Sequence, residues 1–332
     1  MRLPPFDYLE PTTIAEALSL KTQYKESVKV VAGGTEAVAQ MKWRLIQPEV
    51  VMNIKKIPEL LGIREKGHEI IIGANTSLKE LAESPLMKDK CQAVAEAAWL
   101  VASPTIAAMG TVGGNVLQNT RCRYYDQSEI VLKGLEKCHK RGGQVCLAQK
   151  GSKRCFSVYQ GDLAPALMAF DGKGVLEKKG ATRAVPLGDL FSGNGIRPFS
   201  IGEDEILTQI IIPKPEETHG SAYRKLRIRG SIDYPLASAA ALITLTADQK
   251  ISTCRVVIGA AGPAPKMVAG AQAVLQGKTA QGADLGAVAD QAFSLSEGVD
   301  NLTMPGDYRR KMVRVFTKRA LTGAFEAMKG GR

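Results

Sequence analysis

The chain has 332 residues, 45% hydrophobic and 23% charged, which is enough for two or three compact units with apolar cores. No apolar run is long enough to cross a bilayer, and the N-terminus has prolines and early acids where a secretory signal would be apolar. The formal net charge of +11 is compatible with nucleic acid, an anionic cofactor or an acidic protein as partner. Without a secretory signal or a membrane span, we expect a cytoplasmic protein whose cysteines stay reduced and which binds no membrane. Because the cations are spread along the chain without a nucleic-acid-binding motif, we also expect no nucleic-acid partner.

The first unit is expected at residues 1–60. A helix that begins near residue 14 should have Thr12 or Thr13 as its N-cap. A strand then runs into a glycine turn, SVKVVAGG, and the next helix should be capped by Thr35. A second buried strand, VVMNI, follows.

A second unit is expected at residues 61–215 and a third at residues 216–332. In the second unit, we expect a strand, a capped helix and then a further helix that ends before Pro104. The glycine-rich AAMGTVGGN, the buried segment DLAPALMAF and a hairpin, GVLEKKGATRAVPL, follow. A strand near Pro213, ILTQIIIP, leads into the third unit. There we expect two antiparallel strands after SAYRKLRIR, and helices at the end. This order predicts an α+β fold.

Two glycine turns could hold an anion. The first runs from Val31 to Glu36, where unpaired amides at a helix start would meet the ligand. It is neither a G-x-G-x-x-G motif nor a P-loop. The second, Gly110 to Asn115, also offers clustered amides, with one hydroxyl and one side-chain amide. Each alone is also typical of a plain structural turn, but together they indicate one elongated anionic ligand, such as a dinucleotide pyrophosphate.

Four of the six cysteines fall within residues 119–158, with the spacing C-x15-C-x7-C-x8-C: Cys122, Cys138, Cys146 and Cys155. A disulfide pair is not expected in a reduced compartment. Structural zinc would show close C-x2–4-C pairs. Unrelated buried thiols, which we expect Cys91 and Cys254 to be, do not fit so polar a segment. Spacing alone therefore leaves an iron–sulfur cluster and zinc both open, and favours the cluster.

Charge in this segment agrees with a cluster. Between Arg121 and Arg154 there are nine lysines or arginines and three acids. Cations stabilise a cluster held by four thiolates and raise its reduction potential. A solvated basic loop would have the same composition.

At this point VVAGGTEAV, TVGGNVLQNT, GDLAPALMAF and SAYRKLRIRGSIDYPLASAA resemble, in the same order, the FAD-binding subunits of the xanthine oxidase family of molybdenum hydroxylases. The resemblance covers essentially the whole chain. It implies a two-part FAD-binding domain followed by a C-terminal antiparallel sheet with helices. It also implies FAD contacts at Val31, Ala32, Gly33, Gly34, Thr35, Glu36, Ala37, Thr111, Gly114, Asn115, Asp162, Leu207 and Lys225.

Three of these positions have more specific expectations. Asp162 matches an aspartate near the adenosine part of FAD, although it also suits the N-cap of a helix. Leu207 and Lys225 match positions closer to the flavin ring, although Lys225 also suits an exposed strand position.

Most members of that family pass directly from the GGN turn to the D-x-x-P-A-L segment, whereas here residues 119–158 intervene. This insertion resembles that of the β subunits of 4-hydroxybenzoyl-CoA reductases, which carry an extra [4Fe–4S] cluster beside FAD. The resemblance implies that Cys122, Cys138, Cys146 and Cys155 are the cluster ligands.

The same resemblance implies an electron-transfer subunit with no catalytic residue of its own. Its partners would be a molybdenum-cofactor large subunit and a [2Fe–2S] small subunit, in a dimer of heterotrimers. Reduced ferredoxin would be the donor for reductive removal of the phenolic hydroxyl of 4-hydroxybenzoyl-CoA, and would dock near Lys137, Lys140 and Arg141. Two alternatives stay open. One is the flavin subunit of a related hydroxylase or dehydrogenase for another aromatic or heterocyclic substrate; the other is a zinc-stabilised binding module without redox activity.

Overall fold

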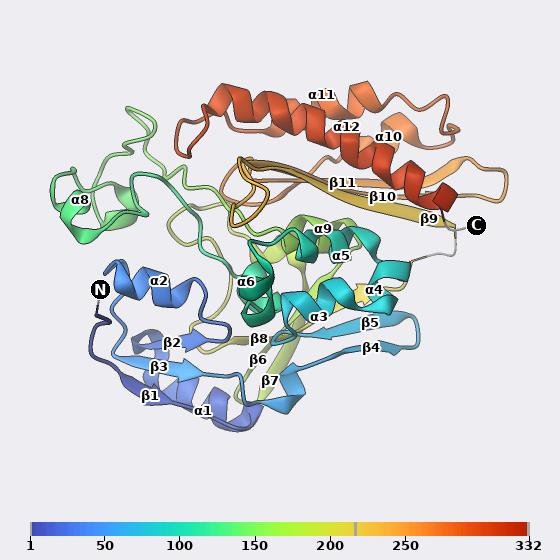
Figure 1. The fold of residues 1–332 in the computed structure, drawn as a ribbon. Helices are drawn as coiled ribbons and strands as arrows, with labels where there is room; N and C mark the ends of the chain where they lie inside the picture. Colours follow the sequence, from blue (N-terminus) through green and yellow to red (C-terminus); the bar gives the residue numbers. More distant parts are fainter. Residues whose placement is uncertain (1, 216–217, 331–332) are drawn as a thin grey trace.

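The computed structural model describes residues 2–215 and 218–330, and within these ranges the strands form three sheets (Figure 1). The expected boundary at 215/216 therefore adjoins two residues, 216 and 217, that lie outside the described part, as do residues 331 and 332 at the end of the third unit. The fold is α+β, as expected: a two-part domain followed by an antiparallel sheet with helices.

The first sheet is parallel, in the order β1-β3-β2: β1 (Asp7–Leu9), β3 (Val50–Asn53) and β2 (Val28–Val31). Its helices are α1 (Ile14–Tyr24) and α2 (Ala37–Lys42). The expected cap of α1 is confirmed, because Thr13 accepts a hydrogen bond from the Glu16 amide. The expected cap of α2 is wrong: Glu36 occupies the N-cap position, and it makes no side-chain capping bond.

The second sheet is antiparallel, in the order β4-β5-β8-β6-β7: β4 (Ile63–Lys66), β5 (Glu69–Gly73), β8 (Ile206–Pro213), β6 (Lys173–Lys178) and β7 (Ala181–Pro186). Strand β8 thus returns to the centre of the sheet, where Ile211 pairs with Ile71. The helices are α3 (Leu78–Glu83), α4 (Pro85–Lys90), α5 (Gln92–Trp99), α6 (Pro104–Met109), α7 (Val112–Val116), α8 (Glu129–Lys133) and α9 (Leu163–Ala169).

The third sheet is antiparallel, in the order β12-β11-β10-β9: β12 (Lys266–Met267), β11 (Ile251–Gly259), β10 (Ala237–Leu245) and β9 (His219–Leu226). Three helices cover one face, α10 (Ala271–Leu275), α11 (Leu285–Leu295) and α12 (Gly306–Gly330), and α5 and α9 pack on the other (Figure 1). Because both faces are covered, β10 is a continuous apolar run rather than an alternating one.

Short 3-10 helices complete the chain: η1 (Lys25–Ser27), η2 (Pro58–Leu60), η3 (His139–Arg141) and η4 (Leu187–Leu190). In the described part of the chain, no helix combines the length and the apolar character needed to cross a membrane.

The cysteine-containing insertion extends from the second unit as an irregular segment around α8 (green in Figure 1). Its two ends are joined by a short antiparallel bridge. The Arg121 amide donates to the Val158 carbonyl at 2.7 Å, and the Val158 amide donates to the Arg121 carbonyl at 2.8 Å. The segment therefore leaves the second unit and returns to it at one point.

Candidate functional site

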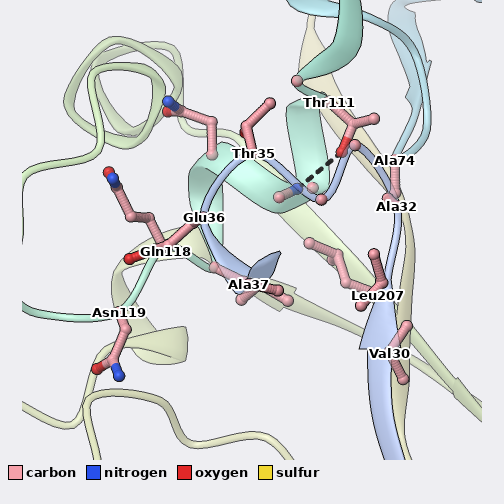
Figure 2. Close-up of a pocket in the computed structure, with 18 of the residues that line it drawn as sticks. Val30, Ala32, Thr35, Glu36, Ala37, Ala74, Thr111, Gln118, Asn119 and Leu207 are labelled. Carbon is pink, nitrogen blue, oxygen red and sulfur yellow. Dashed lines mark hydrogen bonds between the residues drawn. The ribbon is translucent and has the colours of Figure 1, made fainter. Parts of the chain in front are cut away.

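A cavity of about 720 Å³ lies where the first sheet and α2 face the second unit (Figure 2). This volume is typical of a small-molecule or cofactor site. Twelve of the thirteen positions expected to contact FAD line it: Val31, Ala32, Gly33, Gly34, Thr35, Glu36, Ala37, Thr111, Gly114, Asn115, Asp162 and Leu207. Lys225 is not among the lining residues.

The first glycine turn presents a row of free amides to this cavity. Among the described residues, the N–H groups of residues 33–37 have no hydrogen-bond partner. Gly34 has a left-handed φ of +70°. Gly33 lies against the end of α6, where a Cβ would stand 2.1 Å from the Met109 carbonyl oxygen. Consecutive free amides in a turn form a nest that attracts an anion, so this turn suits a pyrophosphate.

The second glycine turn uses its amides differently. Thr111 caps α7, and its hydroxyl oxygen accepts from the Gly114 amide at 3.1 Å (dashed line in Figure 2). The amides of Val112 and Gly113 donate to the carbonyls of Thr76 and Ala74. The expectation of clustered free amides here is therefore wrong, because backbone carbonyls just after β5 already accept hydrogen bonds from them. What this turn offers a ligand is the Thr111 hydroxyl proton and a close backbone surface.

Some polar side-chain atoms on the cavity wall have no hydrogen-bond partner in the described part of the chain. The Asn115 Oδ1 accepts from the Leu163 amide at 3.0 Å, which leaves the Asn115 Nδ2 for a ligand. The buried Asn75 Oδ1 and Gln118 Oε1 have no hydrogen-bond partner within the described ranges. Leaving such atoms unpaired is costly, so they suit a ligand that brings hydroxyl or amino donors.

Figure 2 shows that the two ends of the cavity differ. Val30, Ala32 and Leu207 lie at one end, and Glu36, Gln118 and Asn119 at the other. An elongated ligand with an anionic middle and a flat apolar group therefore fits the walls. FAD is such a ligand.

Charges on the cavity wall are strongly affected by burial. Burial raises the pKa of Glu36 to about 6, although Arg121, 3.6 Å away, acts in the opposite direction. Partial desolvation beside the cavity wall also lowers the pKa of Lys29, which lines the cavity and remains exposed to solvent. A phosphate in the first turn would stabilise the charged form of Lys29.

Asp162 and Lys225 meet behind the wall. The Lys225 Nζ lies 3.0 Å from Asp162 Oδ1, and the Tyr223 hydroxyl donates to the same oxygen at 2.7 Å. Asp162 stands at the N-cap position of α9 without a side-chain capping bond, so the helix-cap alternative does not describe it. Lys225 is buried, not exposed, and it anchors Asp162. Burial raises the pKa of Asp162, and the Lys225 charge counteracts this.

Several lining residues have no signal in the sequence. Asn75, Gln118 and Tyr234 lie on loops or helix ends whose local pattern is ordinary. Only the register of the sheets and the packing of Tyr234 under Arg121, 4.3 Å from its ring centroid, bring them to the wall. Lys29 could have been suspected, since it is a cation in the strand that leads into the glycine turn.

The four cysteines of the insertion line one small second cavity: Cys122, Cys138, Cys146 and Cys155. Cys138 is buried and the other three are partly buried. Within the described residues, no three His, Cys, Asp or Glu side chains stand close enough to hold a single metal ion. A [4Fe–4S] cluster takes one thiolate on each of four irons, and four cysteines around one cavity are a ligand set of that kind.

The thiols are surrounded by both acidic and basic side chains. Burial raises the pKa of Cys122 to about 12, so its thiol keeps its proton unless a metal replaces it. The Cys122 amide donates to Asp126 at 2.8 Å, and Asp126 lies 3.9 Å from Arg121. Lys140, expected at the surface, instead turns inward and donates to the Thr120 carbonyl and to Asn119.

The remaining cysteines belong to the packed cores, as expected. Cys91 is fully buried at the start of α5, and Cys254 is buried in β11. Burial raises the pKa of each to about 12. Such thiols are inert and take no part in either cavity.

Comparison with known proteins agrees with this geometry. Residues 4–215 match the family described as "FAD binding domain in molybdopterin dehydrogenase", and residues 221–324 match "CO dehydrogenase flavoprotein C-terminal domain". Carbon monoxide dehydrogenase medium chains are similar over nearly their whole length. The protein from Hydrogenophaga pseudoflava is 29% identical over 97% of this chain and 98% of its own, and that from Afipia carboxidovorans is 31% identical over 96% of each.

Another relative and a solved structure agree. The nicotinate dehydrogenase FAD-subunit of Eubacterium barkeri is 31% identical over 68% of this chain and 64% of its own. The structure of carbon monoxide dehydrogenase from Hydrogenophaga pseudoflava that lacks the Mo-pyranopterin moiety superposes with a TM-score of 0.80 at 28% identity. It covers 98% of this chain and 99% of the other. The chain therefore belongs to the FAD-binding medium subunits of the molybdenum hydroxylase family, as an oxidoreductase component whose molybdenum centre is on another subunit.

Proposed function

We propose that this chain is the electron-transfer subunit of a molybdenum hydroxylase or dehydrogenase, and that it holds a [4Fe–4S] cluster in addition to FAD. The observation that supports the cluster is the convergence of four cysteines, 33 positions apart from first to last, on one small cavity. The ligands would be Cys122, Cys138, Cys146 and Cys155.

The residues of the larger cavity have separate roles toward FAD in this proposal. The free amides of residues 33–37 would hold the pyrophosphate. Asn115 and Thr111 would contact the opposite side of the same region, and Leu207 would pack near the flavin ring. Asp162 would accept a hydrogen bond from the adenosine part, and Lys225 would keep it ionised. Bound FAD exchanges one or two electrons, which suits it to join one-electron and two-electron centres.

We propose two partner subunits: a large subunit with the molybdenum cofactor and a small subunit with [2Fe–2S] centres, assembled as a dimer of heterotrimers. The support is the similarity over nearly full length to proteins named as medium chains, which are by name one part of a larger enzyme. A cytoplasmic location goes with this proposal, because cluster ligands have to stay reduced.

The relatives favour an oxidative reaction. They are carbon monoxide, nicotinate and caffeine dehydrogenases, so we favour a dehydrogenase or hydroxylase that takes electrons from a small or heterocyclic substrate. The second candidate is the reductive dehydroxylation of 4-hydroxybenzoyl-CoA with ferredoxin as donor. Only the four-cysteine insertion supports it, since the substrate pocket would lie on the large subunit.

Metal and flavin analysis of the purified complex tests the cofactor assignment. We expect one FAD, and about four irons beyond those of the [2Fe–2S] centres. Replacing Cys122 or Cys146 by alanine should remove those four irons and leave FAD in place. The matched control is Cys254→Ala, which removes a core thiol and should leave both cofactors. Zinc in place of the additional iron would refute the cluster.

The direction of electron flow needs its own assay. The complex should be tested with candidate heterocyclic substrates and an oxidised acceptor, and separately with reduced ferredoxin and 4-hydroxybenzoyl-CoA. Substrate-dependent reduction of the acceptor is the expected result. Formation of benzoyl-CoA in the second assay, without activity in the first, would establish the second candidate instead.

A further inference from the structure

A hydrogen-bonded pair of buried hydroxyls lies between the cysteine cavity and the flavin cavity. The Ser157 Oγ is 3.2 Å from the Cys155 Sγ, and the Ser157 amide donates to the same sulfur at 3.4 Å. The Ser157 Oγ is also 2.8 Å from the Thr120 Oγ1. Both residues are only 1% exposed. None of the other three cysteines of the insertion has a hydroxyl on its sulfur among the described contacts.

The chain of contacts continues to the flavin side. Lys140 Nζ donates to the Thr120 Oγ1 at 2.6 Å and to the Asn119 Oδ1 at 3.1 Å. Asn119 lines the larger cavity, on the same side as Glu36 (Figure 2). One continuous series of hydrogen bonds thus joins a cysteine sulfur to the wall of the flavin site.

A proton count shows that this series suits two states of Cys155. Gly195 supplies a shared acceptor, because its carbonyl lies 2.7 Å from the Ser157 Oγ and 2.8 Å from the Thr120 Oγ1. When Cys155 is a thiol, its S–H can donate to Ser157, and the Ser157 hydroxyl to the Gly195 carbonyl. When Cys155 is a thiolate, it can only accept. Ser157 then donates to the sulfur, and Thr120 alone satisfies the Gly195 carbonyl.

The Thr120 hydroxyl is therefore what releases Ser157 for the sulfur. Lys140 donates to Thr120 in both states, so the Thr120 proton is left to point at Gly195. No buried group loses a partner in the exchange. An unpaired buried group would be costly, and the arrangement avoids this in both states.

The backbone at Gly195 is shaped around this pair. A Cβ at position 195 would stand 2.6 Å from the Ser157 Oγ and 3.0 Å from the Cys155 Sγ. Its φ is not positive, so the requirement for glycine comes from the close approach and not from backbone conformation.

We propose that Ser157 is the positioning residue of the cysteine cavity: backed by Thr120 and Lys140, it donates its hydroxyl to the Cys155 sulfur when that sulfur binds iron as a thiolate, and so raises the reduction potential of the cluster. The inference rests on the proposed [4Fe–4S] cluster. Hydrogen bonds to ligand sulfurs stabilise the more negative, reduced state, and their number is one determinant of cluster potential. The cysteine that this series of hydrogen bonds joins to the flavin wall would carry this bond.

The test is an EPR-monitored redox titration of the purified complex. In Ser157→Ala the cluster midpoint should move to a more negative potential, with iron and FAD contents unchanged. Thr120→Val should move it in the same direction, although Thr120 does not touch the sulfur, because the Gly195 carbonyl would then draw the Ser157 proton away. Ser157→Thr keeps the hydroxyl and should restore most of the wild-type potential. The matched control is Ser152→Ala, whose hydroxyl serves only Arg154 in the same insertion.

The outcomes separate this inference from the proposed function. An additional-iron content of zero in the wild-type complex would refute the cluster itself. Four additional irons with the same midpoint in wild type, Ser157→Ala and Thr120→Val would overturn the role of Ser157. If Ser157→Ala does not retain its cluster, Thr120→Val decides, together with ENDOR. An exchangeable proton coupled to the wild-type cluster, and weakened in Thr120→Val, supports the role; its absence in the wild type overturns it.

Discussion

Lys225 and Asp162 form a nearly solvent-free ion pair, with their side chains 1% and 3% exposed and 3.0 Å between the Nζ and Oδ1 atoms. Breaking a buried pair from one side leaves a buried charge without a partner. Because Asp162 lines the flavin cavity and Lys225 stands behind it, the pair links the stability of the third sheet to the shape of the cofactor site.

We expect Asp162→Asn to lower the free energy of unfolding by about 3–5 kcal/mol, since it leaves the Lys225 ammonium buried without a counter-ion, with the Asp233 carbonyl as its remaining acceptor. Lys225→Met should cost less, because burial already favours the protonated form of Asp162 and Tyr223 still donates to it. The double variant should cost less than the sum of the two, as measured by chemical denaturation. Asp248→Asn breaks an exposed pair and is the control, with an expected change under about 1 kcal/mol. Additive single effects would contradict the coupling.

Glu36 predicts a pH dependence of stability in the FAD-free protein. Its folded pKa of about 6 lies above the ordinary value of 4.5, so the native state binds the proton more tightly. The resulting stability is fully present below pH 4.5 and is lost as the pH rises through 6. The difference corresponds to about 2 kcal/mol. Glu36→Gln should therefore be more stable relative to wild type at pH 7.5 than at pH 4, by about that amount in denaturant titrations. Parallel pH profiles for the two proteins would show that Glu36 is not the responsible group.

Gly33→Ala should reduce FAD binding. The new Cβ would meet the Met109 carbonyl at 2.1 Å, so the first turn must move away from α6 and its amides lose their common direction. We expect at least about a tenfold weaker affinity for FAD, with about 1–3 kcal/mol of lost stability from overpacking. Flavin fluorescence titration of the FAD-free protein measures the affinity. Gly282→Ala, where the nearest atom is 3.7 Å away, is the control, and equal affinities in both variants would argue against the turn as pyrophosphate site.

The second candidate function, with ferredoxin as donor, predicts that ferredoxin docks on the insertion, and exposed residues there can test this. Lys140 is unsuitable because it is turned inward, whereas Lys137, Lys150 and Lys153 are exposed. Replacing these three by glutamate should slow ferredoxin-driven reduction by roughly tenfold at low ionic strength, and the difference should fade at high salt. The control is the same change at the exposed Lys55, Lys66 and Lys79. Equal rates for both triple variants at low salt would remove ferredoxin docking from this surface.

Much of the fold could be predicted from local patterns in the sequence. Strand β5, the β6–β7 hairpin and helix α1 with its Thr13 cap follow from apolar periodicity and capping, which act over a few residues. Helix α11 was covered only by the general expectation of helices at the end, because its apolar face is defined by packing on α12. The proposed boundaries at 60/61 and 215/216 stay predictions.

The candidate site could be predicted from the sequence only in part, and the wrong predictions have one common cause. The glycine turns were found from composition, but which amides are free depends on whether a distant carbonyl, such as that of Ala74, takes them. The same holds for Lys140, which reads as a surface cation and is turned inward by Thr120 and Asn119. Hydrogen-bond partners far apart in sequence are set by the sheets, and no local pattern encodes them.

The two-bond bridge between Arg121 and Val158 has a consequence for biogenesis. Backbone hydrogen bonds alone close the base of the insertion. Bringing the two ends of this loop together, with its entropic cost, therefore does not depend on metal binding. If the four cysteines hold the proposed cluster, the rest of the chain can fold before iron is available, and insertion of the cluster would be the last step of maturation. Iron supply would set how much enzyme is active without setting how much polypeptide survives.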